Sequence, residues 1–313
     1  MELAIEANDL RKTYAGDVEA VQGVDFEVAL GEVFGLIGPN GAGKSTTVGM
    51  LTTTIVPTSG TARLAGFDVV AHPLTARAVS SVVFQEPVVD RSLSGRQNLE
   101  LHTRLWGVEP RESQMRIDEL AATLGLDLLL DRPAGSYSGG ERRRLEIARA
   151  LVSHPRVLFL DEPTVGLDPR IRAELLDVIA GLRNRNELTV LLTTHYLEEA
   201  EKLCDRVAII HAGRIVALDT PRALLAALGR ELVELRVDDD VGSALASLRQ
   251  RGIAGDDAFA VGSRLTLPLH DASAPEAMAA VRELGLAGAI SARQPTLDDV
   301  YLRLTGDSLA AAA

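Results

Sequence analysis

A glycine-rich loop directly after a short apolar run is the feature that most constrains how this chain can fold. Residues 33–38 read VFGLIG, which is typical of a buried strand, and a helix is expected from residue 45 to about residue 51. Between them, residues 38–45 read GPNGAGKS and match the pattern G-x-x-x-x-G-K-[ST]. This order of strand, loop and helix predicts an α/β fold with a phosphate-binding loop.

The residue types in this loop suit the binding of nucleotide phosphates. Glycines let backbone N–H groups turn inward around an anion, and the positive N-terminal end of the next helix adds to the attraction. We expect Lys44 to reach the outer phosphates and the Ser45 hydroxyl to bind Mg²⁺. The residues expected to bind ATP in this segment are Gly38, Pro39, Asn40, Gly41, Ala42, Gly43, Lys44, Ser45 and Thr46.

A second apolar run ends in two carboxylates. Residues 156–163 read RVLFLDEP, which predicts a strand followed by Asp161 and Glu162. Alone, such a pair is more often a helix cap or a solvated turn. Together with a phosphate loop, it predicts that Asp161 holds Mg²⁺ and that Glu162 polarises the attacking water.

A third motif narrows the family. Residues 137–145 read YSGGERRRL and precede an amphipathic helix that runs to about residue 152. A serine followed by glycines is alone a common helix start. After the phosphate loop and before the acidic pair, however, this motif resembles the signature of the ABC ATPase superfamily, usually written LSGGQ. Tyr137 and Glu141 depart from that signature, whereas the expected phosphate-binding residues Ser138, Gly139 and Gly140 are retained.

The resemblance implies roles for four further residues, each of which is weak evidence alone. Gln85 matches the glutamine that binds Mg²⁺ and senses the membrane subunit, and His195 matches the switch histidine near the γ-phosphate. Asp168 matches the aspartate of a loop that crosses the dimer interface, and Tyr14 matches the aromatic residue that stacks on adenine. With Glu162 and Lys44, Gln85 and His195 complete the expected catalytic set.

The same resemblance implies the architecture of residues 1–228: a RecA-like P-loop NTPase core, an antiparallel β subdomain, and a helical signature subdomain at about residues 87–153. It implies a dimer of two copies, or of this chain with a sister ATPase, in which each ATP lies between one phosphate loop and the partner's signature motif. Residues 86–106 are the expected groove for a helix of a separate polytopic membrane subunit.

Residues 229–313 contain no NTPase motif and are expected to form a small α+β accessory domain. Their pattern predicts strand, helix, two strands, helix, strand and a last helix at residues 296–304, as in a split β-α-β fold. The closing SARQPTLDDVYLRLTG and the YSGGERRRLEIA form of the signature resemble drug-resistance ATP-binding subunits of the daunorubicin and doxorubicin type. That resemblance implies export of a drug, antibiotic or other hydrophobic small molecule. A dimerisation or regulatory role for this domain remains an alternative.

Composition bounds the possible partners and location. A net charge of −12 and a pI near 5.0 disfavour a general nucleic-acid binder. The single cysteine, Cys204, excludes an internal disulfide and fits a reducing compartment. The sequence shows no secretory signal and no run of about 20 apolar residues. We therefore expect a peripheral protein at the cytoplasmic face of the cell membrane, whose membrane-spanning partner is another polypeptide.

Three rival functions share the phosphate loop and the acidic pair. A chromosome-maintenance ATPase needs long coiled-coil heptads between Lys44 and Ser138, which the sequence lacks. A ribosome-acting ATPase normally has two cassettes and basic linkers, whereas this chain has one cassette and an acidic balance. An importer motor with a C-terminal regulatory domain stays open, because the cassette chemistry is the same in both directions.

Overall fold

The computed structural model describes residues 2–182, 188–237, 240–270, 272–284 and 289–306. The chain divides into two compact units, Met1–Ala217 and Leu218–Ala313. This division falls before the domain boundary expected at residues 228/229, because helix α8 (Pro221–Ala226) belongs to the second unit. Within the described residues, no helix combines the length and the apolar character needed to cross a membrane.

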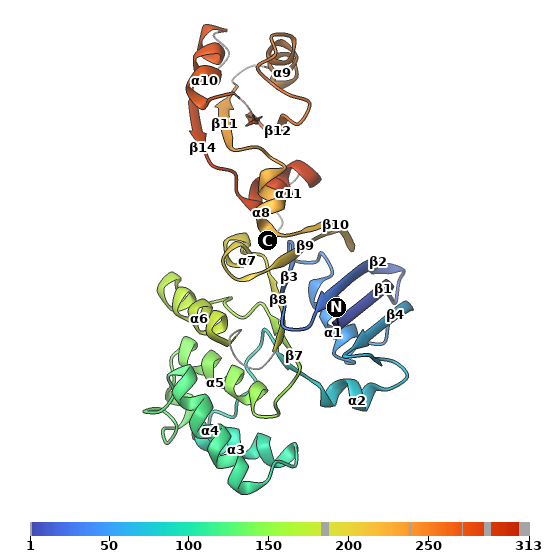
Figure 1. Cartoon of the computed structure of the whole chain (residues 1–313), viewed down its shortest axis with the longest axis vertical. Helices are drawn as coiled ribbons and strands as arrows, with labels where there is room; N and C mark the ends of the chain where they lie inside the picture. The colour runs from blue at the N-terminus through green and yellow to red at the C-terminus, as the bar shows by residue number, and fades with distance from the viewer. Residues whose placement is uncertain (1, 183–187, 238–239, 271, 285–288, 307–313) are drawn as a thin grey trace. The chain divides into compact units, whose positions relative to one another are not determined.

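The first unit is built around a six-stranded sheet (Figure 1). Its strand order is β10-β9-β3-β8-β7-β6, and the pairs β9–β3, β3–β8, β8–β7 and β7–β6 are parallel. Every residue of β3, β7 and β8 is buried, as expected of parallel strands covered on both faces. The strands are β3 (Val33–Ile37), β6 (Ser80–Val83), β7 (Val157–Asp161), β8 (Thr189–Thr194), β9 (Arg206–His211) and β10 (Arg214–Asp219).

A second, antiparallel sheet has the order β2-β1-β4-β5. Its two longest strands, β1 and β2, are twelve residues each, and buried positions alternate with exposed ones over residues 24–28 of β2. The stacked rings of Phe26 and Phe34, whose centroids are 5.4 Å apart, join this sheet to β3. The strands are β1 (Leu3–Tyr14), β2 (Val18–Ala29), β4 (Ser59–Leu64) and β5 (Phe67–Asp68).

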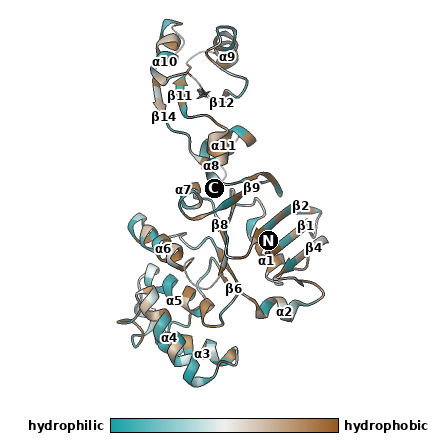
Figure 2. Ribbon diagram, in the orientation of Figure 1, coloured by the Kyte–Doolittle hydropathy of each residue, from teal (hydrophilic) through white to brown (hydrophobic). Residues whose placement is uncertain are grey.

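Helices fill the region between β6 and β7. The helices α3 and α4 show both teal and brown stretches in Figure 2, as amphipathic helices do. Ser94 and Ser138 begin α3 and α5 with capping boxes, in which serine and the residue three positions on satisfy each other's backbone N–H groups. The helices of this unit are α1 (Lys44–Leu51), α2 (Pro73–Ala78), α3 (Gly95–Leu105), α4 (Pro110–Leu124), the 3₁₀ turn η1 (Ala134–Ser136), α5 (Gly139–Leu151), α6 (Pro169–Leu182) and α7 (Leu197–Leu203).

The second unit has a four-stranded antiparallel sheet of order β12-β13-β11-β14, which is the order of a split β-α-β fold. Residues of α9 and α10 pack in one core with the inward positions of β11 and β13. The elements are β11 (Glu231–Arg236), α9 (Val241–Gln250), β12 (Phe259–Val261), β13 (Arg264–Leu269), α10 (Ala274–Glu283), β14 (Ile290–Arg293) and α11 (Leu297–Thr305).

Cys204 ends α7 and is buried. Burial raises the pKa of its thiol, with smaller contributions from nearby carboxylates. The side chain therefore stays protonated at neutral pH and behaves as a small apolar group.

Candidate active site

The phosphate loop spans the gap between β3 and α1, and two of its glycines have no room for a side chain. A Cβ at Gly38 would lie 2.2 Å from the Ile210 carbonyl oxygen. A Cβ at Gly43 would lie 2.5 Å from the Ala20 carbonyl oxygen, and Gly43 has a φ of 106°. The loop therefore passes close to neighbouring backbone in a conformation that favours glycine.

Lys44 begins α1 and points back into the loop. Its ammonium donates to the carbonyl oxygens of Gly38 at 2.8 Å and Pro39 at 3.1 Å. It also lies 3.0 Å from Glu162 Oε1, and both side chains are almost fully buried. The loop thus places a buried cation next to the carboxylate that the sequence predicts as the general base.

Glu162 lies directly after β7 in an unusual backbone conformation. Its φ is 47°, in the left-handed region that residues with a Cβ seldom adopt. The backbone is held there because the Glu162 N–H donates to the carbonyl and hydroxyl oxygens of Thr193, at 3.1 and 3.0 Å. Strain of this kind persists where surrounding contacts fix it, and it is common at functional sites.

Asp161, one residue earlier, faces Ser45. The Ser45 hydroxyl donates to Asp161 Oδ1 at 3.2 Å, and the Thr193 hydroxyl donates to the same oxygen at 2.5 Å. A hydroxyl and a carboxylate in contact beside a phosphate loop are hard oxygen donors of the kind that Mg²⁺ prefers. The residues present at this position therefore fit the magnesium site expected from the sequence.

His195 follows β8 and also approaches Glu162. Its Nδ1 lies 3.4 Å from Glu162 Oε2. The geometry is not that of a hydrogen bond, and within the described residues this buried nitrogen has no hydrogen-bond partner. The imidazole packs on the Tyr196 ring, with centroids 4.1 Å apart. His195 is thus held in place by packing, with a free ring nitrogen beside the candidate base.

The remaining predicted residues lie outside this cluster. Tyr14, at the end of β1, has its hydroxyl 3.5 Å from that of Thr46 and is 41% exposed, so its ring is accessible next to the phosphate loop. Gln85 lines a small pocket of about 140 Å³ with Gly139 and has no hydrogen bond to Ser45 or Asp161 among the described residues. Asp168 caps α6 by accepting from the Ile171 N–H at 3.1 Å.

The signature motif is the N-terminus of α5. The Glu141 carboxylate accepts from the Ser138 N–H at 2.7 Å, and the Ser138 hydroxyl accepts from the Glu141 N–H at 3.3 Å. The hydrogen bond from the Ser138 N–H lowers the pKa of Glu141, although partial burial of the carboxylate opposes this effect. Within the described residues, no hydrogen bond or ion pair joins Ser138 to the phosphate loop of the same chain.

Sequence reasoning missed Arg143, which joins the separate parts of the site. This residue of α5 is only 6% exposed. Its guanidinium donates to four backbone carbonyl oxygens from two segments: that of Phe84 at 2.5 Å, that of Pro163 at 2.8 Å, and those of Asp161 and Glu162 at 3.2 and 3.3 Å. Arg143 therefore ties the signature helix both to the acidic pair and to the residue before Gln85.

A buried carboxylate completes this arrangement. Glu146, three residues on in α5, accepts from Arg143 Nη1 at 2.8 Å and from the Val88 N–H at 2.9 Å. In the sequence, the Arg143–Glu146 pair shows only as an arginine and a glutamate three positions apart, among apolar residues of one helix. That spacing is common on exposed helices, so it did not single the pair out.

Comparisons with known proteins agree with this geometry. The model of the ABC transporter family matches residues 21–165. A daunorubicin resistance ATP-binding protein of Streptomyces coeruleorubidus is 42% identical over 311 residues, covering 97% of this chain and 96% of its own. A doxorubicin resistance ATP-binding protein of Mycobacterium tuberculosis is 41% identical over 319 residues, and the match covers 98% of this chain and 95% of the relative. This chain belongs to the ABC transporter ATP-binding proteins.

Solved structures support the fold of this ABC protein. The structure of cbiO1 from Clostridium perfringens, described as part of the ABC transporter complex cbiONQ, superposes with a TM-score of 0.68 at 25% identity. The superposition covers 80% of this chain and 96% of the cbiO1 chain. The α/β fold class and the family resemblance expected from the sequence are confirmed.

The contacts of Arg143 predict a role in positioning the site. Arg143→Gln is expected to lower kcat for ATP hydrolysis about 100-fold with little change in KM, because small displacements of reacting groups cost about that much. Arg143→Lys keeps a charge for Glu146 but cannot reach all the carbonyl oxygens, so it is expected to fold normally and still lose kcat. Steady-state kinetics and thermal melting measure both effects.

Arg144→Gln is the matched control, because it removes the same charge from the next position of α5. Equal kcat in the Arg143→Lys variant and in this control, at equal melting temperature, would show that Arg143 contributes packing alone.

Proposed function

We propose that this chain hydrolyses ATP to power the export of a drug, antibiotic or other hydrophobic small molecule through a separate membrane subunit. The observation that carries the proposal is the convergence of Lys44, Ser45, Asp161, Glu162 and His195 from three segments of the chain. Likeness over nearly the whole chain to drug-resistance ATP-binding proteins, and to a Nod factor export ATP-binding protein of Paraburkholderia xenovorans at 39% identity, favours export over import.

In this proposal, the Lys44–Glu162 ion pair is the resting state of the site. When ATP binds, the Lys44 ammonium turns from Glu162 to the outer phosphates, to which it donates charge-assisted hydrogen bonds. Glu162 is then left with a buried carboxylate that needs a new donor, and a water molecule supplies it. Glu162 orients that water and accepts its proton as the water oxygen bonds to the γ-phosphorus and the bond to the ADP oxygen breaks. His195, whose Nδ1 has no hydrogen-bond partner among the described residues, donates from that nitrogen to a γ-phosphate oxygen.

We propose that Ser45 and Asp161 hold Mg²⁺, whose positive charge offsets that of the phosphate oxygens. Gln85 was expected as a further ligand. Gln85 lines a pocket with Gly139 and has no hydrogen bond to Ser45 or Asp161 among the described residues, so we propose that it joins this site when ATP and Mg²⁺ bind. The contact of Arg143 with the Phe84 carbonyl oxygen provides a physical connection between that segment and Glu162.

The open N-terminus of α5 supports a dimeric mechanism. Helix N-termini attract phosphate, and among the described residues no hydrogen bond joins Ser138, Gly139 or Gly140 to the phosphate loop of their own chain. We propose that they bind the ATP held by a second copy, or by a sister ATPase. In such a dimer, Asp168 would lie in the loop that crosses the interface. ATP then links the two chains, and its hydrolysis lets them separate.

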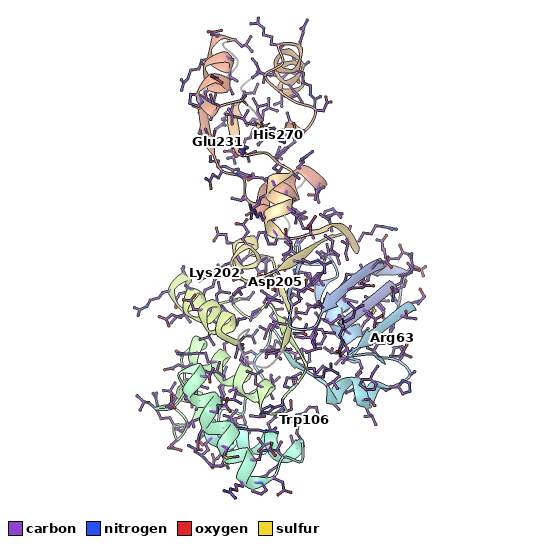
Figure 3. All side chains as sticks on the ribbon, viewed as in Figure 1. Arg63, Trp106, Lys202, Asp205, Glu231 and His270 are labelled. Atoms are coloured by element: carbon purple, nitrogen blue, oxygen red, sulfur yellow. The ribbon has the colours of Figure 1, made fainter. Side chains whose placement is uncertain are left out.

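A groove beside α3 is our candidate for the docking site of the membrane subunit. It has a volume of about 540 Å³ and is lined mainly by apolar atoms, with Phe84 and Trp106 among its large exposed residues. Trp106, labelled in Figure 3, lies next to α3. Of the residues that line the groove, His102 and Trp106 belong to residues 86–106, the stretch expected from the sequence to receive a helix of the membrane subunit, and the others lie outside it. A peripheral position at the cytoplasmic face of the membrane follows from this proposal.

Arg149 suggests the chemistry of the docking helix. Its Nε is buried without a hydrogen-bond partner among the described residues, and it lines the groove. Burial, followed by the Arg149 charge, lowers the pKa of His102 to about 4, so that imidazole is neutral and accepts from the Trp106 indole N–H at 2.9 Å. Among the described residues, no acidic side chain lies within ion-pair distance of Arg149, and the charge of Glu146, which pairs with Arg143, acts on it only from farther away. We therefore propose that a carboxylate of the membrane subunit pairs with Arg149.

Replacing the base tests the hydrolysis step. Glu162→Gln is expected to lower kcat by about 10²- to 10⁴-fold, the usual contribution of a general base, and to leave ATP affinity nearly unchanged. Glu198→Gln, an exposed glutamate of α7, is the control and should behave as wild type. Turnover measured with purified protein, beside the equilibrium affinity for ATP, decides the question. Wild-type turnover in Glu162→Gln would exclude Glu162 as the base.

Copurification tests the transport function. The tagged chain, extracted gently from its own membranes, is expected to bring down a polytopic membrane protein in stoichiometric amount. Arg149→Gln should reduce that yield about tenfold through loss of one charge-assisted contact. The exposed Arg170→Gln is the charge-matched control. If only soluble partners copurify with an active ATPase, the transport function is wrong while the ATPase chemistry stands.

A further inference from the structure

The sheet of the second unit has two unlike faces, and only one of them is covered by α9 and α10. Paired residues of neighbouring strands point to the same face. The pairs Val233–Leu267 and Leu235–Leu265 pack in the core with those helices. The alternate pairs, Glu234–Thr266 and Arg236–Arg264, therefore lie on the other face, together with Ser291, which pairs with Glu234 from β14.

This second face forms a pocket of about 670 Å³. Its volume lies within the range of about 300–1,000 Å³ that is usual for small-molecule sites. Phe259 and Val261 of β12 pair with Thr266 and Arg264, so they share this face, and Leu302 of α11 lines the pocket as well. All three are partly exposed, so the pocket offers apolar surface. Glu231 and His270, labelled in Figure 3, mark the opposite end of the β11–β13 pair from Arg236 and Arg264.

The charges in this pocket are not balanced. Arg293 donates to both Asp299 oxygens at 2.6 and 2.7 Å and to Glu234 at 2.6 Å. These hydrogen bonds, Asp299 first, raise the pKa of Arg293 despite partial burial, and they occupy the one carboxylate that lines the pocket, that of Glu234. In the part of the chain that the structure describes, Arg236 and Arg264 have no acidic side chain within ion-pair distance.

Two cations that face each other without an acidic partner among the described residues are unfavourable. Like charges in a cross-strand pair destabilise a sheet, and Arg236 faces Arg264 in this way. The chain as a whole carries a net charge of −12, so this local excess of positive charge runs against its overall balance. An anion between Arg236 and Arg264 removes the repulsion. Guanidinium groups suit carboxylate, sulfonate and phosphate groups in particular, since their planar donors match two oxygens at once.

We propose that this pocket binds a small amphipathic anion, with its acidic group between Arg236 and Arg264 and its apolar body against Phe259, Val261 and Leu302. A second copy of the chain is a poorer occupant, because two such faces related by a twofold axis bring the same arginines together. This binding site is separate from the ATP-binding residues and does not depend on the proposed export function.

Two matched dyes test the charge requirement on the full-length chain. Anilinonaphthalene sulfonate is an aromatic anion, and phenylnaphthylamine has the same rings without the acidic group. The double variant Arg236→Gln, Arg264→Gln is expected to bind the sulfonate about tenfold more weakly, through loss of charge-assisted contacts, and to bind phenylnaphthylamine within about twofold of wild type. Both arginines are exposed, so the fold should be preserved, which melting checks.

The control double variant Arg251→Gln, Arg282→Gln removes the same charge from exposed positions outside the pocket. It should bind both dyes as wild type does. In wild-type protein, the sulfonate should also slow amide exchange in residues 231–236 and 264–269. Equal sulfonate affinity in wild type and in the pocket variant, equal loss of both dyes, or unchanged exchange in these strands would overturn the proposal.

Discussion

Lys44 and Glu162 bury opposite charges 3.0 Å apart, although one begins the first helix and the other follows β7. Burying either charge alone costs several kcal/mol, so each group requires the other or a substitute. In the resting protein, this requirement holds the phosphate loop against the end of β7. In the proposed mechanism, it also links binding to chemistry, because a phosphate that takes Lys44 leaves Glu162 in need of a donor.

Arg143 extends this arrangement to the rest of the site. A guanidinium has five donors, and here they join the signature helix, the acidic pair and the segment before Gln85. A shift of that segment therefore changes the contacts of the residue that supports Glu162. The groove that we assign to the membrane subunit includes Phe84, whose carbonyl oxygen Arg143 binds. The same contacts thus offer a route by which docking could affect hydrolysis.

The sequence predicted the site residues most fully where they lie close together along the chain. The phosphate loop, the acidic pair and the signature serine each lie within a few residues, next to a strand or helix whose pattern is clear. The Lys44–Glu162 pair and the contacts of Arg143 depend on strand order, which no local pattern contains. The placement of Gln85 depends on the position of a segment after β6. In the second unit, alternation predicted the strands, but the facing pair of Arg236 and Arg264 emerged only from cross-strand register.

The central claim is that each chain carries half of each ATP site and that ATP completes it. Sedimentation of purified Glu162→Gln protein tests this most directly, since blocked hydrolysis retains bound ATP. The account predicts a monomer without nucleotide and a dimer with saturating ATP and Mg²⁺, provided the chain pairs with itself. A monomer under both conditions in the presence of every copurifying subunit, or a dimer that forms equally without ATP, would contradict it.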